Sequence, residues 1–169
     1  MSNAMKFTAL GLAAASAILL VLIQFLPMES DDVGADITAN LWGWSVGQHD
    51  ESWTDCEDCG GTGLLVTGAV FLTVGLVAAA AAAALFLLAP ARVAAITAFG
   101  ACALSLVGFI LWTSGYGDVP FRQATDAGVG FIFAIIACSL LAIAGLLGVL
   151  VKSAATAAAP ASPKKGVNF

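Results

Sequence analysis

Residues 64–112 read LLVTGAVFLTVGLVAAAAAAALFLLAPARVAAITAFGACALSLVGFILW, an almost unbroken apolar run. As one helix this run would be about 73 Å long at about 1.5 Å per residue, whereas the hydrocarbon layer of a bilayer is about 30 Å thick. A break is therefore required, and the segment Ala89-Pro90-Ala91-Arg92 supplies it. Proline suits the first turn of a new helix, where its missing N–H is not needed. The run predicts two membrane-spanning helices, 64–88 and 91–112, joined by a tight turn.

Two further apolar stretches, residues 7–26 and 129–151, are also long enough to cross a bilayer. None of the four stretches shows the alternation that membrane strands of about 10 residues would require. The chain is 60% hydrophobic and only 10% charged, with a mean hydropathy of +0.99. We predict an all-α integral membrane four-helix bundle over residues 5–152, with the lipid bilayer as its first partner.

The basic residues indicate the orientation of this bundle. Five of them fall on one predicted side and only Arg122 on the other; the five are Lys6, Arg92, Lys152, Lys164 and Lys165. Lysine and arginine in short loops mark the cytoplasmic face, so we expect both termini to be cytoplasmic, in a plasma or cytoplasmic membrane. Residues 27–63 then form an outer cap, and residues 113–128 form a second outer loop.

The outer cap is strongly acidic. It holds nine of the eleven acidic residues of the chain and no lysine or arginine: Glu29, Asp31, Asp32, Asp36, Asp50, Glu51, Asp55, Glu57 and Asp58. Their spacing is not that of a calcium loop, so a solvated acidic surface is expected.

The two ends of the chain have distinctive compositions. Residues 1–4, Met-Ser-Asn-Ala, are typical of an expression scar, with Met5 as the natural start. The apolar run that follows is longer than a signal peptide core, so an uncleaved first helix is expected. Residues 153–169 are rich in Ala, Ser and Pro and predict a disordered cytoplasmic tail.

Small residues recur at four-residue spacing along the predicted helices. Helices in lipid associate through close packing, which small side chains permit. We therefore expect the helix-packing positions to include Gly75, Ala79, Ala98, Cys102, Gly130, Ala134 and Cys138. Cys102 and Cys138 would lie near the middle of the membrane, where a thiol mostly acts as a small apolar group.

Several function classes are disfavoured by what the predicted helices lack. Away from their ends they contain no ionisable residue, and such residues usually mark ion pathways and proton relays. The single histidine, His49, provides neither a haem ligand pair nor a hydrolytic triad. These absences argue against a pump, a proton-coupled carrier, a selective channel and a hydrolase, and no nucleic-acid partner is expected.

The outer cap contains three of the four tryptophans, Trp42, Trp44 and Trp53. Residues 41–46 alternate with period two, which predicts a short strand. A turn at residues 47–50 and a return through residues 51–55 would complete a β-hairpin. The tryptophans are candidate partner contacts, because this residue dominates binding hot spots. The alternative is that they form the core of the cap.

Cys56 and Cys59 form the one chemical motif, a Cys-x-x-Cys sequence just before the second helix. A structural disulfide is the first interpretation, since this side of the membrane is oxidising. A redox-active pair is the second. A zinc site formed by His49, Cys56 and Cys59 with a neighbouring carboxylate is the third.

The position of this motif resembles that in the bacterial disulfide-forming quinone reductases of the DsbB type. Those four-helix membrane enzymes carry a Cys-x-x-Cys before their second helix, so the resemblance implies a redox role for Cys56 and Cys59 and a quinone cofactor. Their second cysteine pair has no counterpart in residues 113–128.

The overall plan is similar to that of the claudin-type tetraspan proteins. The residues that carry this resemblance are Asn40-Leu-Trp-Gly-Trp44, followed by Cys56 and Cys59. The resemblance implies a small extracellular sheet with the two cysteines in a disulfide. We expect a non-enzymatic structural or assembly protein without cofactor or metal, which self-associates or binds a larger membrane complex through its cap. A thiol–disulfide oxidoreductase is the alternative.

Overall fold

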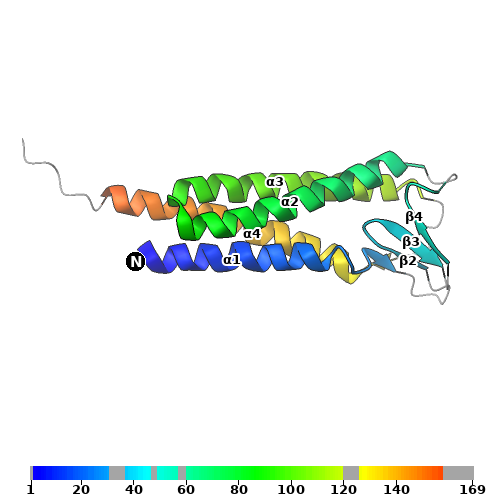
Figure 1. Cartoon of the computed structure of the whole chain (residues 1–169), viewed down its shortest axis with the longest axis horizontal. Coiled ribbons are helices and arrows are strands. Elements are labelled where there is room, and N and C mark those ends of the chain that lie inside the picture. The colour runs from blue at the N-terminus through cyan, green and yellow to red at the C-terminus, as the bar shows by residue number, and fades with distance from the viewer. Residues whose placement is uncertain (1, 31–36, 47–48, 57–59, 120–125, 158–169) are drawn as a thin grey trace, which may run out of the picture.

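The computed structural model describes residues 2–30, 37–46, 49–56, 60–119 and 126–157, with the backbone alone at 2, 49 and 151–157. Four helices run side by side along one axis, and a small sheet caps one end (Figure 1). They are α1 (Ser2–Leu22), α2 (Thr62–Leu88), α3 (Ala91–Tyr116) and α4 (Val129–Ala157). All four are long and apolar enough to cross a membrane, as the sequence predicted.

The bounds of the first and last helices differ from the predicted ones. Helix α1 begins at Ser2, so residues 2–4 form its first turn, and it ends at Leu22 instead of residue 26. Residues 23–26 continue in tighter turns, and Pro27 then follows. Pro27 has no N–H to donate back to the helix, and its ring would clash with the carbonyl of Ile23 in a continuous helix, so α1 ends ahead of it. Helix α4 continues to Ala157, past the predicted start of a disordered tail at residue 153. Residues 158–169 lie outside the described part of the chain.

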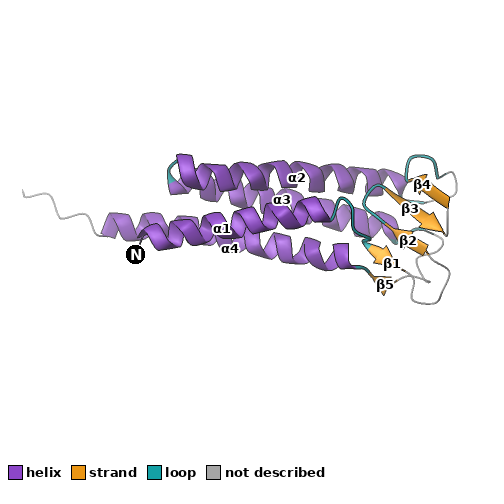
Figure 2. Cartoon of the chain, turned by 60° about the horizontal axis from the view of Figure 1, so that its bottom comes forward, coloured by secondary structure: helices purple, strands orange, loops and turns teal. Residues whose placement is uncertain are grey.

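The predicted break between α2 and α3 is confirmed. Ala89 is extended, and Pro90 occupies the N-cap position of α3. The turn lies at the same end of the bundle as the N-terminus, opposite the sheet (Figures 1 and 2). Helix α3 reaches Tyr116, about one turn beyond the predicted residue 112.

Helices α2 and α3 approach each other through facing glycines. A methyl group added at Gly108 would lie 2.7 Å from the backbone nitrogen of Leu72 and 2.8 Å from the carbonyl oxygen of Gly68. At Gly115 it would lie 2.8 Å from the carbonyl oxygen of Gly61. Gly61 also has a φ of 74°, a left-handed conformation that favours glycine. Only glycine at these positions allows the two backbones to come this close.

The other helix pairs close the bundle through small side chains and a few hydrogen bonds. Helix α1 contacts α2 and α4, and α4 also contacts α3. The buried hydroxyl of Ser16 in α1 donates a hydrogen bond to the carbonyl oxygen of Ala137 in α4, at 2.9 Å. Such bonds between helices help association where lipid provides no hydrophobic drive. Larger aliphatic side chains point outward, among them Val77, Ile96, Ile110 and Ile132.

The cap is a five-stranded antiparallel sheet in the order β4-β3-β2-β1-β5. The strands are β1 (Glu29–Ser30), β2 (Ile37–Ala39), β3 (Gly43–Val46), β4 (His49–Ser52) and β5 (Asp126–Ala127). The predicted hairpin is confirmed as β3 and β4, with Trp44 paired to Glu51. The sheet is larger than predicted, because β5 from the second loop pairs with β1 and joins the two connections (Figure 2).

The glycine contact between α2 and α3 leads to a stability prediction. Replacing Gly108 with Ala should lower the stability by about 1–3 kcal/mol, because the added methyl meets backbone atoms that cannot move independently. Gly100 on the same helix is the matched control, since an added methyl there has nothing within 4 Å. Gly100→Ala should be neutral or stabilise by up to about 1 kcal/mol. Thermal unfolding in detergent measures both; equal melting temperatures for the two variants would contradict the prediction.

Candidate functional site

The turn between β2 and β3 organises the cap. The side-chain oxygen of Asn40 accepts hydrogen bonds from the backbone N–H groups of Trp42, at 3.1 Å, and Gly43, at 2.8 Å. Asparagine is favoured in turns because its side chain can bond to the backbone in this way. Gly43 is buried against the carbonyl of Glu51, where a larger residue would collide with the backbone of β4. The motif Asn40-Leu-Trp-Gly43 therefore forms one tightly held turn.

Two buried tryptophans hold this turn onto the helices. The indole Nε1 of Trp53 donates to the carbonyl oxygen of Asn40 at 3.2 Å, and that of Trp112 donates to the carbonyl oxygen of Leu41 at 3.3 Å. The rings of Trp112 and Tyr116 stack with centroids 5.1 Å apart, and Trp53 meets both edge to face. Leu41, Trp53 and Trp112 are completely buried. This aromatic cluster joins the cap to α3.

The burial of Trp53 corrects one sequence-based interpretation. Trp53 was predicted as a partner contact, but its side chain has no exposed surface and belongs to the core of the cap. Trp44 is half-buried and packs against the same core. Only Trp42 is widely exposed, at 42% of its surface. Sequence could not separate the three, because each is a tryptophan in the same acidic segment.

Trp42 is nevertheless held in a defined orientation. Its indole Nε1 donates to the side-chain oxygen of Gln24, just beyond α1, at 3.1 Å. The hydroxyl of Thr73 in α2 shares its proton between the carbonyl oxygen of Ala69, at 2.9 Å, and the same Gln24 oxygen, at 3.3 Å. Gln24 thus connects the cap to both helices, and its own Nε2 donates to the carbonyl oxygen of Leu20. Trp42 is therefore an exposed aromatic side chain that a hydrogen bond holds in one orientation.

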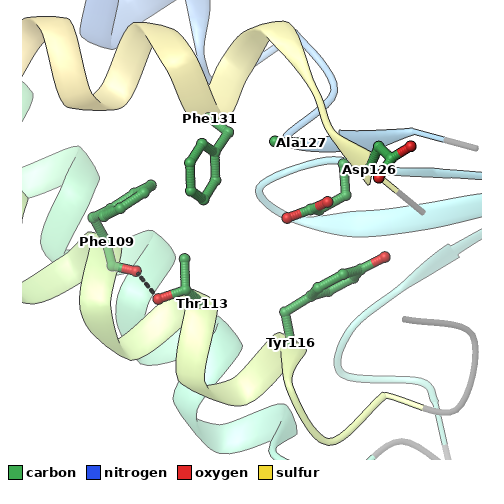
Figure 3. A pocket seen from close by; sticks show the side chains of 7 residues that line it. Phe109, Thr113, Tyr116, Asp126, Ala127 and Phe131 are labelled. Carbon is green, nitrogen blue, oxygen red and sulfur yellow. Dashed lines mark hydrogen bonds between the residues drawn. The ribbon is translucent and has the colours of Figure 1, made fainter. Parts of the chain in front are cut away.

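A cavity of about 400 Å³ lies between α3 and α4, next to strands β1 and β5 (Figure 3). Its lining residues are Glu29, Phe109, Thr113, Tyr116, Asp126, Ala127 and Phe131. Figure 3 shows Phe131 projecting from α4 toward Phe109 and Thr113 on α3. The two phenylalanine rings meet edge to face with centroids 4.8 Å apart. The cavity therefore has an aromatic floor inside the bundle and two carboxylates on the side of the sheet.

The residues that line this cavity carry no signal in the sequence that predicts a site. Phe109 and Phe131 appeared as ordinary members of apolar runs, and Asp126 as one polar residue of the second loop. The lining comes from four separate segments, and only the pairing of β5 with β1 brings Asp126 and Glu29 to the same place. No local sequence pattern predicts the pairing of β5 with β1.

The Cys-x-x-Cys motif is described only in part. Cys56 is half-buried and follows β4 in the cap, while Cys59 lies outside the described residues. The side chain of His49 also lies outside them, although its backbone belongs to β4. The zinc, redox and disulfide interpretations of this motif therefore stay predictions. Among the residues that are described, no three His, Cys, Asp or Glu side chains come together as a metal site.

The predicted packing residues lie at helix contacts of the bundle. Gly75 faces Ser105 of α3, and Ala79, Ala98 and Ala134 are completely buried. At Gly130 an added methyl would lie 2.8 Å from the carbonyl oxygen of Pro27, so the start of α4 packs closely on the segment after α1.

Cys102 and Cys138 face each other across the contact between α3 and α4. Both are free thiols and both are half-buried. The sulfur of Cys102 donates a weak hydrogen bond to the carbonyl oxygen of Cys138, at 3.4 Å. Their small side chains therefore sit within the contact between the two helices.

Comparison with known proteins gives no family for this chain: no family's sequence profile matches it, and no characterised protein shows significant sequence similarity.

The tryptophan anchors lead to a prediction about the cap. Trp112→Phe keeps a stacked ring but leaves the buried carbonyl of Leu41 without its donor, which should cost about 1–3 kcal/mol. Trp42→Phe removes an indole that is 42% exposed, so it should cost less than about 1 kcal/mol. Thermal unfolding of the two variants in the same detergent makes the comparison. A larger loss for Trp42→Phe would show that the buried anchor is not what holds the cap.

Proposed function

We propose that this chain is a non-enzymatic tetraspan membrane protein that serves as a structural or assembly component. Its outer cap would present a preformed surface to a second copy or to a larger membrane complex. The observation that carries this proposal is the fixed, exposed indole of Trp42, held by Gln24. An ordered aromatic side chain loses little conformational freedom on binding, which favours its use as an anchor. Tryptophan is also the residue type most enriched among binding hot spots.

The proposal includes a claudin-like plan for the chain. A sheet that caps one end of a four-helix bundle, with its Asn40-Leu-Trp-Gly turn on the buried tryptophans, fits what that resemblance implies. The orientation proposed is cytoplasmic for both termini. Lys6 and Arg92 lie at the end of the bundle opposite the sheet, which agrees with the greater positive charge of cytoplasmic loops. The acidic cap would then face outward.

A disulfide between Cys56 and Cys59 is part of the proposal. The chain has four cysteines, and Cys102 and Cys138 are free thiols. Within one chain, Cys59 is then the only cysteine available to Cys56. The bond would fasten the end of the cap just before α2, on the oxidising side of the membrane.

Thiol labelling of intact cells distinguishes a structural disulfide from a redox pair. A membrane-impermeant maleimide should label neither Cys56 nor Cys59 until a reductant is added. The labelling state should also be the same in growing and resting cells, since a structural bond does not turn over. Cys102 and Cys138 should react only after denaturation, because both lie between helices. A Cys56 that cycles between free and oxidised forms, with loss of oxidation of another protein in Cys56→Ser cells, would support an oxidoreductase instead.

Association should depend on the exposed tryptophan. Trp42→Ala is expected to weaken self-association or complex recovery by about tenfold or more, as for a binding hot spot. Cross-linking in native membranes, followed by purification under mild detergent, measures the loss. Leu88→Ala is the control, because Leu88 is 85% exposed and lies at the opposite end of the bundle. Equal recovery of the partners with the wild type and Trp42→Ala would contradict the proposed contact.

A further inference from the structure

The cavity between α3 and α4 has the dimensions of a small-molecule site. Its volume of about 400 Å³ falls within the range of ligand pockets in proteins, about 300–1,000 Å³. It also lies where the apolar helices meet the polar sheet, so one ligand could contact both environments. Trp42, the proposed association contact, is not among its lining residues.

The chemistry of the lining favours a positive charge. The faces of aromatic rings carry partial negative charge and attract cations, and Phe109 and Phe131 supply two half-buried rings. Tyr116 also lines the cavity, but one face of its ring is stacked on Trp112. Glu29 and Asp126 add two carboxylates, and among the residues that the structure describes the lining includes no lysine, arginine or histidine. Asp126 is exposed, so its carboxylate is accessible from the side of the sheet.

The same lining is poorly suited to a metal ion. Calcium takes six to eight oxygen ligands and magnesium requires six. Here the side-chain oxygens are those of two carboxylates, Tyr116 and Thr113. The hydroxyl of Thr113 already donates to the carbonyl oxygen of Phe109, at 3.0 Å. Three of the seven lining residues are aromatic, and ring carbon can contact a weakly hydrated organic cation but cannot replace the oxygen ligands of a strongly hydrated metal.

We propose that this cavity binds an organic ammonium ion, of which quaternary ammonium groups are the best fit. The aromatic rings would surround the methyl groups, and Asp126 with Glu29 would balance the charge. The residues that follow the two phenylalanines, Ile110 and Ile132, are 52% and 50% exposed on the outer surfaces of α3 and α4. An alkyl chain attached to the ammonium group could therefore continue along the bundle into lipid.

The test uses the full chain in nanodiscs of phosphatidylglycerol, which has no ammonium headgroup. Calorimetric titration with tetramethylammonium probes the free cation, and dodecyltrimethylammonium below its micellar concentration probes the same group with a tail. Empty nanodiscs provide the background. Saturable binding of both with similar affinity would identify a soluble ammonium ligand. Tighter binding of the amphiphile, by about tenfold or more, would identify a lipid-like ligand.

Variants decide whether the cavity is the site. Asp126→Asn should weaken the binding of either probe by about tenfold, because it removes one of two charges while leaving the fold intact. Phe131→Leu, which keeps an apolar wall but removes a ring, should weaken it by about fivefold. Asp50→Asn is the control, since Asp50 is an exposed carboxylate on β4, at the opposite edge of the sheet. It should leave binding unchanged.

Three results would overturn the proposal. The first is no saturable binding of either ammonium probe above that of empty nanodiscs. The second is an equal loss in Asp126→Asn and Asp50→Asn, which would mean that the cations respond only to the overall acidity of the cap. The third is saturable calcium binding that depends on Asp126 while tetramethylammonium and its amphiphile fail to bind.

Discussion

Helices α2 and α3 touch backbone to backbone, and the half of the molecule that carries the sheet is arranged around that contact. Gly68 and Gly108 meet in this half of the helix pair, and Gly61 and Gly115 meet at its end beside the sheet. Lipid provides little hydrophobic drive between helices, so the energy of association must come from close packing of this kind. With α2 so close on one side, the large rings at the end of α3 are positioned toward the sheet. The buried aromatic cluster of the cap is the result.

That cluster explains how a sheet with two-residue strands can be stable. Small sheets are marginal alone, and β1 and β5 contribute only two residues each. Here the buried indoles of Trp53 and Trp112 hold the turn at Asn40. Each indole donates a hydrogen bond to a backbone carbonyl of the turn, that of Asn40 or that of Leu41. A buried carbonyl without a donor would lower the stability of the fold. Each tryptophan therefore both packs in the core and satisfies a buried carbonyl group. The core of the cap is thus continuous with the core of the helical bundle. The exposed Trp42 belongs to a turn that this shared core holds in place.

The sequence allowed the four helices and the β3–β4 hairpin to be predicted, because length, apolarity and period-two alternation are local signals. It gave the wrong end for α1, since residues 23–26 are as apolar as the helix before them and only Pro27 marks the change. The short strands β1 and β5 have no periodicity to detect. Trp42 and Trp53 lie just outside β3 and β4, and their different burial depends on how the Asn40 turn packs against α3. The cavity depends on four segments that only the tertiary structure brings together.

The two sides of α3 pack differently within a single turn, through a small residue on one side and a large ring on the other. Gly108 closes the contact with α2, while its neighbour Phe109 faces Phe131 of α4. Two bulky rings hold the outer ends of α3 and α4 apart, and the space beside them becomes the cavity. Tyr116 lines that cavity and stacks on Trp112, whose indole holds the turn at Leu41. A ligand in the proposed site would therefore contact Tyr116, which is a member of the ring stack that holds the turn of the cap.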